Sequence, residues 1–335
     1  MTQSSFAIEA RRLQKTYAAS GKSPEKLALK GLDLAIPKGS IFGLLGPNGA
    51  GKSTFINILA GLVIKTAGEV RIWDIDIDKD HRAAKAAIGI VPQEISFDAF
   101  FTPYETLELQ AGFYGVPPKE RRSMELLDAV GLADKRDTYS RQLSGGMKRR
   151  LLIAKALVHT PPVVILDEPT AGVDVELRRS LWEYITMLNK ERGVTVVLTT
   201  HYLEEAQELC DNIAIIDQGR LIACEPTPTI LRRLDKKAVV ISPLEPLTQI
   251  PEGMTDLECV LRPDGALAIH YRPNEHSVEA LLSQAMGSGV RIKDLRIEEP
   301  NLEDVFVALT TPAGGRSSSG RSADNRQASW SRNAS

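Results

Sequence analysis

The spacing of hydrophobic residues changes along the chain, and these changes mark the expected elements. Phe6 to Tyr17 and Leu27 to Ile36 alternate apolar and polar residues, which predicts two strands of a sheet with one covered face. Val163–Leu166 is a continuous apolar run, the pattern of a parallel strand buried on both faces. The apolar run Ile41–Leu45 is also expected to form a strand, and a second buried strand is expected over Val194–Thr200. The first part of the chain is therefore expected to be α/β.

A shorter strand is predicted from Glu69 to Ile77, and the spacing becomes helical from Phe100 onward. Thr102-Pro103-Tyr104-Glu105 has the capping-box pattern with proline at the first helical position, and it opens a helix to Tyr114. A second helix is predicted over 119–130. We expect a helical subdomain at about residues 100–158.

The C-terminal part is predicted to be a separate unit, because Pro226 and Pro228 interrupt the pattern. The expected organisation is a large domain over 1–235, a small α+β unit over 236–311 that closes with a helix from Asn301, and a disordered tail over 312–335. The tail is rich in Ser, Gly, Arg and Ala, which cannot build a packed core.

Composition narrows the classes of function. The formal net charge of the 335 residues is −2, so no basic field favours a nucleic-acid partner. No run approaches the roughly 18 apolar residues of a membrane span, so any membrane role is expected to come through a partner.

The strongest chemical signal follows the strand at Ile41–Leu45 and matches G-x-x-x-x-G-K-[ST], a phosphate-binding loop. Backbone amides of such a loop turn inward around phosphate oxygens, and the helix that follows adds its positive dipole end. Lys52 is expected to reach the β- and γ-phosphates, and the Ser53 hydroxyl to bind Mg²⁺. The loop consists of Gly46, Pro47, Asn48, Gly49, Ala50, Gly51, Lys52, Ser53 and Thr54.

Two further groups suit phosphate chemistry. Ser144, Gly145 and Gly146 open an amphipathic helix, although each glycine costs roughly 1 kcal/mol against alanine in a helix. A helix start without Cβ atoms lets a phosphate approach closely; the alternative is an ordinary Ser-Gly-Gly turn.

Asp167 and Glu168 end a buried strand, where they could hold Mg²⁺ and accept a proton from water; the alternative is two acids at a corner between a strand and a turn.

Three single residues indicate a function only when they are considered together with these motifs. Tyr17 is expected to stack on an adenine base, His201 to contact the γ-phosphate from the end of its strand, and Gln93 to leave the sheet after Ile88–Val91. Taken alone, each is more often a structural or solvated residue.

Together these pieces resemble the nucleotide-binding subunit of an ATP-binding cassette (ABC) transporter, over about Phe6 to Leu234. The resemblance implies a P-loop NTPase (RecA-like) ABC ATPase core with a helical subdomain, an antiparallel β subdomain and a small C-terminal α+β domain. It makes Tyr17 the aromatic adenine contact, Gln93 the Q-loop, His201 the switch histidine and Asp174 the D-loop aspartate. Walker A falls on the loop above and Walker B on Val163 to Glu168. The signature sequence is Leu143, Ser144, Gly145, Gly146 and Met147, with methionine in the usual position of glutamine.

The resemblance also implies a mechanism. Two such subunits form a head-to-tail dimer, a homodimer or a pair with a related ATPase subunit, and each ATP lies between the Walker A loop of one chain and the signature of the other. Glu168, His201 and Gln93 are the implied catalytic residues, and Ser53, Gln93 and Asp167 the implied Mg²⁺ ligands.

Met147-Lys148-Arg149-Arg150 and the segment from Asn301 to Phe306 resemble the ABC-2 exporter branch. That branch implies a separate permease with about six membrane spans, contacted through the Gln93 loop and segment 100–142, with the ATPase on the cytoplasmic side of the cell membrane. The alternative from another class is a soluble ABC ATPase acting on DNA or ribosomes. The chain has one cassette, no coiled-coil insertion and no basic stripe, which all count against that alternative.

Overall fold

The structure is a computed structural model that describes residues 5–310, apart from 20, 22–23, 96–97, 171–174, 201, 234–236 and 299–301. Asp174, His201, the boundary predicted at residue 235 and the predicted tail lie outside the described residues, and these expectations stay predictions. Within the described part of the chain, no helix is long and apolar enough to span a membrane.

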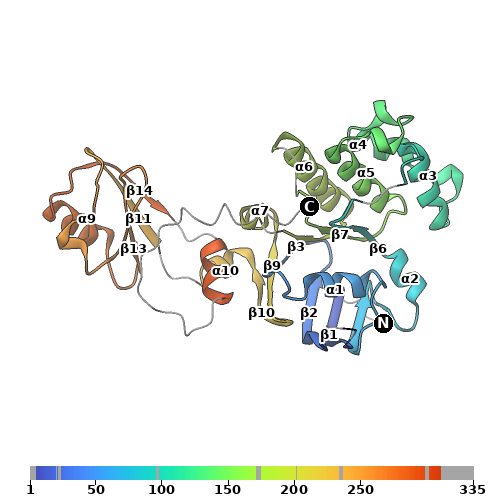
Figure 1. Cartoon of the computed structure of the whole chain (residues 1–335), viewed down its shortest axis with the longest axis horizontal. Helices are drawn as coiled ribbons and strands as arrows, with labels where there is room; N and C mark the ends of the chain where they lie inside the picture. Colours follow the sequence, from blue (N-terminus) through green and yellow to red (C-terminus); the bar gives the residue numbers. More distant parts are fainter. Residues whose placement is uncertain are drawn as a thin grey trace.

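A six-stranded sheet in the order β10-β9-β3-β8-β7-β6 forms the centre of the larger part of the molecule (Figure 1). Its strands are β3 Ile41–Leu45, β6 Ile88–Val91, β7 Val163–Asp167, β8 Thr195–Thr199, β9 Asn212–Asp217 and β10 Arg220–Pro226. The neighbouring strands are parallel except for the β9–β10 hairpin. Val163 and Ile165 pack into one core cluster and Val164 and Leu166 into the other. The burial of this strand on both faces is confirmed.

One face of the central sheet is covered by an antiparallel sheet in the order β2-β1-β4-β5 and by two helices. These elements are β1 Phe6–Tyr17, β2 Lys26–Pro37, β4 Ala67–Ile72, β5 Ile75–Asp76, α1 Lys52–Leu59 and α2 His81–Ala86. The prediction of one strand over 69–77 is wrong, because the chain turns between β4 and β5. Trp73 and Asp74 have φ values of 51° and 68°, and a two-residue turn with both φ values positive joins hairpin strands.

The other face is covered by helices, with α3, α4 and α5 in the helical segment (Figure 1). The helices are α3 Pro103–Phe113, α4 Ser123–Ala129, α5 Gly145–Leu157, α6 Val175–Arg192, α7 Leu203–Leu209 and α8 Thr227–Leu231. The capping box of Thr102 and Glu105 is present in full, with both reciprocal hydrogen bonds. The second predicted helix is shorter than expected, because a 3₁₀ turn over Pro118–Glu120 precedes α4.

A third sheet, in the order β12-β13-β11-β14, is antiparallel and has helix α9 on one face. Its elements are β11 Lys237–Pro243, β12 Glu258–Leu261, β13 Leu267–Tyr271, α9 Val278–Gly287 and β14 Ile292–Glu298. The α+β character predicted for this part is confirmed.

The last described helix, α10 Leu302–Thr310, packs away from the third sheet. Leu302 and Val305 are buried in the helix-covered core of the central sheet, and α10 contacts α7 and α8. The Leu302 amide donates a hydrogen bond to the side-chain carbonyl of Gln207 at 2.9 Å. The expectation that this helix packs within the C-terminal unit is therefore wrong.

Candidate functional site

The phosphate-binding loop leaves β3 and enters α1, as expected from its sequence. The loop has no room for side chains at two positions: a Cβ on Gly46 would lie 2.2 Å from the carbonyl oxygen of Ile216, and one on Gly51 would lie 2.9 Å from that of Ala28. Gly51 is the N-cap of α1, and no side chain caps it. The first amides of α1 are thus available to an anion.

Lys52 bends back over the loop. Its ammonium group donates to the carbonyl oxygens of Gly46 at 2.5 Å and Pro47 at 3.2 Å. Burial lowers the pKa of Lys52, while the carboxylates of Glu168 and Asp167 oppose this shift. A partly buried lysine beside two carboxylates is a cation that an anionic ligand can recruit.

The two acids at the end of β7 are fixed by one hydroxyl of β8. Thr199 Oγ1 donates to the Asp167 carboxylate at 2.5 Å and accepts from the Glu168 amide at 3.1 Å. Burial raises the pKa of Asp167, the Thr199 hydrogen bond lowers it, and the Glu168 charge raises it further. Glu168 has a φ of 48°, a strained conformation for a residue with a side chain, and such strain is concentrated at functional sites.

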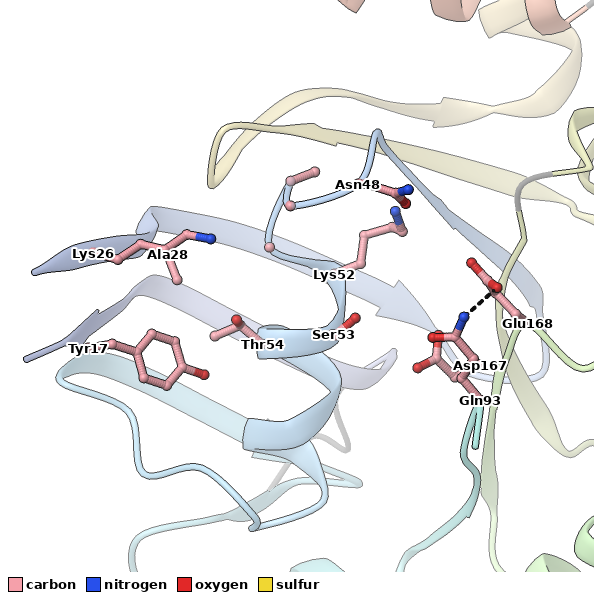
Figure 2. A pocket seen from close by; sticks show the side chains of 13 residues that line it. Tyr17, Lys26, Ala28, Asn48, Lys52, Ser53, Thr54, Gln93, Asp167 and Glu168 are labelled. Atoms are coloured by element: carbon pink, nitrogen blue, oxygen red, sulfur yellow. Dashed lines mark hydrogen bonds between the residues drawn. The ribbon is translucent and has the colours of Figure 1, made fainter. Parts of the chain in front are cut away.

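Gln93 meets Glu168 directly, because its amide nitrogen donates to Glu168 Oε2 at 2.8 Å (Figure 2). Figure 2 shows Lys52 and Ser53 on one side of a pocket, with Gln93, Asp167 and Glu168 on the other. Tyr17 lies at the far end of the pocket from Glu168. The lining residues are Tyr17, Lys26, Ala28, Asn48, Gly49, Ala50, Gly51, Lys52, Ser53, Thr54, Gln93, Asp167 and Glu168.

Tyr17 is 37% exposed, and the ammonium of Lys15 lies 4.9 Å from the centroid of its ring. Lys15 is held there by a hydrogen bond to the Ile64 carbonyl at 2.8 Å. One face of the ring thus has a cation over it, which leaves the opposite face as the one available for stacking.

The structure brings most of the predicted site residues together. Gly46 and Pro47 line an adjoining hollow, which also includes Lys52 and Glu168. Phe306 of α10 reaches the same hollow.

The signature residues do not line this pocket. Ser144 caps α5, since its hydroxyl accepts from the Met147 amide at 3.2 Å. Leu143 is buried in the core and Met147 packs against it, whereas a Cβ on Gly145 would meet nothing within 4 Å. Packing within the described part of this chain therefore does not explain that glycine.

Sequence reasoning missed Arg149. Its side chain is 4% exposed and its Nη1 donates to the carbonyl oxygens of Pro92 at 2.8 Å and Gln93 at 2.9 Å. Burial lowers the pKa of Arg149, and the charges of Glu168 and Asp167 oppose this. Arg149 falls among the apolar positions of α5, before Leu152 and Ile153. That position could have predicted that the arginine is buried.

The phosphate loop lies at the end of a core strand and faces two acids at the end of another strand of the same sheet. This arrangement defines the chain as a P-loop nucleotide-binding protein. The family model described as "ABC transporter" matches residues 29–171. This chain belongs to the ABC transporter family, and as a member it binds and hydrolyses ATP.

Curated relatives match nearly the whole chain. It is 37% identical over 316 residues to the linearmycin resistance ATP-binding protein LnrL of Bacillus subtilis, covering 90% of this chain and 98% of that protein. It is also 37% identical over 309 residues to the Nod factor export ATP-binding protein I of Paraburkholderia xenovorans, covering 91% and 97%. The daunorubicin resistance ATP-binding protein DrrA2 of Streptomyces coeruleorubidus is 35% identical over 314 residues, covering 91% and 95%.

Solved structures agree with the fold. A dimeric ATP-binding cassette in a post-hydrolysis state, bound to ADP and phosphate, shares 31% identity with a TM-score of 0.60; the match covers 66% of this chain and 98% of that one. An ATP-binding subunit of an ABC transporter shares 28% identity with a TM-score of 0.61, over 68% and 92% of the two chains. The predictions of family, fold and ATPase activity are confirmed.

Proposed function

We propose that this chain is the ATPase subunit of an ABC-2 type exporter, in which two ATPase subunits close on ATP and drive a separate permease. The observation that supports this most strongly is the pocket in which Lys52 and Ser53 face the paired Gln93 and Glu168 across a gap. The names of the curated relatives, which are resistance and export ATP-binding proteins, favour export over a role on DNA or ribosomes.

ATP enters this proposal with its base on Tyr17 and its phosphates on the loop. Lys52 exchanges its contacts with the carbonyl groups of Gly46 and Pro47 for the β- and γ-phosphates, and the amides of the first turn of α1 bind phosphate oxygens.

Ser53, Gln93 and Asp167 are the proposed Mg²⁺ ligands, and all three line the pocket. They offer a hydroxyl, an amide oxygen and a carboxylate, the oxygen ligands that Mg²⁺ prefers. Bound there, the ion would neutralise phosphate charge. Burial destabilises the charged form of Asp167 and raises its pKa. A cation bound nearby would stabilise that charged carboxylate.

Glu168 is the proposed general base that accepts a proton from the attacking water. Its backbone is fixed by two hydrogen bonds to Thr199, and Gln93 holds its carboxylate. His201 is proposed to order the same water with Gln93. Arg149 is proposed to position Gln93, because it binds the backbone carbonyl groups of Pro92 and Gln93.

The second surface for each ATP is proposed to come from another subunit, either a second copy or a related ATPase. The open space around Gly145 supports this, because a phosphate brought by a partner would approach the bare start of α5. Asp174 of the D-loop is proposed to lie at the same interface.

The permease is proposed to dock beside the helical segment, as a membrane protein with about six spans, which places this chain at the cytoplasmic side of the cell membrane. Exposed apolar side chains in and around α3 support a protein partner there. They are Phe100, Phe101, Tyr104, Leu109, Phe113 and Tyr114. No nucleic-acid partner is expected.

The Glu168→Gln variant tests the base. Turnover of ATP is expected to fall by about 10²–10⁴, the range for a lost general base, while ATP binding persists. The matched control is Glu191→Gln, at an exposed acid near the end of α6, which should hydrolyse ATP at the parental rate. Parental turnover in Glu168→Gln would remove Glu168 from this role.

The same variant tests the partner. Tagged Glu168→Gln protein, recovered from solubilised membranes with ATP and Mg²⁺, should retain one polytopic membrane protein, identified by mass spectrometry. Recovery of ribosomal or DNA-bound proteins alone would contradict export.

A further inference from the structure

Strand β14 forms one edge of the C-terminal sheet. It pairs with β11 on one side, and no strand in the described part of the chain pairs with its other side. Five successive residues, 293–297, are exposed. An open edge presents unpaired backbone groups that another strand can join.

The direction of the free backbone groups follows from one hydrogen bond. The Leu295 amide donates to the carboxylate of its own neighbour Asp294 at 2.8 Å, so it points away from β11. Because amides alternate along a regular strand, that of Ile297 points outward as well. A bulge opposite Ser242 and Pro243 interrupts the alternation at Lys293.

The two faces of β14 differ in chemistry. Leu295 and Ile297 stand opposite Ile241 and Val239, whose side chains pack into the core beneath α9. Leu295 is 41% and Ile297 49% exposed, so this apolar face continues beyond the covered core to the edge of the sheet. Asp294 and Arg296 lie on the opposite face, since side chains alternate along a strand.

We propose that β14 pairs antiparallel with β14 of a second copy of this chain, centred on Leu295, and joins the two C-terminal sheets. Of the two-fold registers centred within the strand, those centred on Asp294, Leu295 and Arg296 keep at least five of its residues paired. Centring on Asp294 places two aspartates opposite each other, and centring on Arg296 places two arginines opposite each other. Centring on Leu295 places Asp294 opposite Arg296 of the partner subunit, twice, by symmetry.

The contacts already present allow this pairing. The Leu295 amide transfers its hydrogen bond from Asp294 to the backbone carbonyl of the partner's Leu295, and this releases the Asp294 carboxylate for the partner's Arg296. Arg296 donates to Glu298 through Nε at 2.9 Å, and its other guanidinium nitrogens remain to serve the second carboxylate. The pairing needs no nucleotide, so it stands or falls separately from the proposed function.

Disulfide trapping of the full-length chain tests the register. In the pairing centred on Leu295, the two Leu295 Cα atoms lie about 5.5 Å apart, within disulfide range. The two Ile297 residues are four strand steps apart, about 14 Å. In a background with Cys224, the exposed native cysteine, replaced by serine, Leu295→Cys should give a cross-linked dimer under mild oxidation and Ile297→Cys should not.

Charge reversal tests the partner. Asp294→Arg and Arg296→Asp should each lose the cross-link when combined with Leu295→Cys, because like charges then stand opposite each other. An equimolar mixture of the two variants should regain it, since every opposed pair is then of opposite sign. ATP binding to each variant confirms that it is folded.

No cross-link in Leu295→Cys, equal cross-linking in Ile297→Cys, or no recovery in the mixture would overturn the proposal. Cross-linking of Leu295→Cys to a permease in membranes, without a homodimer, would also overturn it.

Discussion

The phosphate loop, which precedes α1, and the signature, which opens α5, both contain glycines, but these glycines have different surroundings. A Cβ on Gly46 would meet the Ile216 carbonyl oxygen at 2.2 Å, whereas one on Gly145 would meet nothing within 4 Å. The first glycine is required by the packing of its own chain. The second has no such requirement within the described residues, as expected if the proposed contact of the signature helix is with a phosphate bound to another subunit.

A side chain in the crowded phosphate loop should cost more stability than any other change considered below. Gly46→Ala should lower the free energy of unfolding by about 3 kcal/mol, because a backbone carbonyl cannot move aside as a flexible side chain would. Denaturant unfolding measures this. In the same loop Gly49 has open space and a φ of +81°, so Gly49→Ala should cost less, about 1–2 kcal/mol of backbone strain. Equal losses in the two variants would contradict the packing argument.

At the start of α5, where Gly145 has open space, a substitution should instead raise the stability of the fold. Gly145→Asp places a carboxylate in the first turn of α5, where it interacts favourably with the helix dipole, so the fold should gain about 0.3–1 kcal/mol. The same charge repels a phosphate brought by a second subunit, and ATP hydrolysis should fall by about 10²-fold. Thermal unfolding and steady-state turnover together separate the two effects. A variant that is both more stable and fully active would show that no phosphate approaches Gly145.

A smaller effect is expected at Arg149, which joins the signature helix to the Gln93 loop of its own chain. Arg149→Lys keeps the charge and loses the guanidinium fork, so kcat should fall about tenfold with KM for ATP unchanged. Arg150 is a matched control, since its Nη1 also donates to two carbonyl oxygens, those of Val130 at 2.9 Å and Gly131 at 3.1 Å. Arg150→Lys should keep the parental kcat; an equal loss in both variants would assign Arg149 a structural role alone.

The charge of Asp167 should have a modest effect on how the melting temperature depends on pH. Burial raises the pKa of Asp167, and a raised carboxyl pKa costs stability as pH rises through the folded-state value. Asp167→Asn removes this cost, so the nucleotide-free variant should melt at a higher temperature than the parent at pH 7 and show less dependence on pH above the ordinary aspartate range. Addition of Mg²⁺-ATP should stabilise the parent more than the variant. A lower melting temperature of the nucleotide-free variant at pH 7 would contradict the sign of this argument.

The sequence predicted the phosphate loop, the two acids at the end of β7 and the start of α5 because each depends on neighbours in the chain. Apolar runs also revealed strands buried on both faces. The hairpin at Trp73 and Asp74 escaped prediction because neither residue is a glycine, although both adopt positive φ. The packing of α10 and the contact of Arg149 with the Gln93 loop depend on segments far apart in sequence, where periodicity carries no information.

Each ATP site is proposed to combine the phosphate loop of one subunit with the signature helix of another. The most direct test mixes two inactive chains, Lys52→Ala and Gly145→Asp, in equal amounts and measures ATP hydrolysis. Half of the subunit pairs would then be mixed, each with one intact site, so activity should return to about a quarter of the parental value. A mixture that stays as inactive as its components would contradict the shared site.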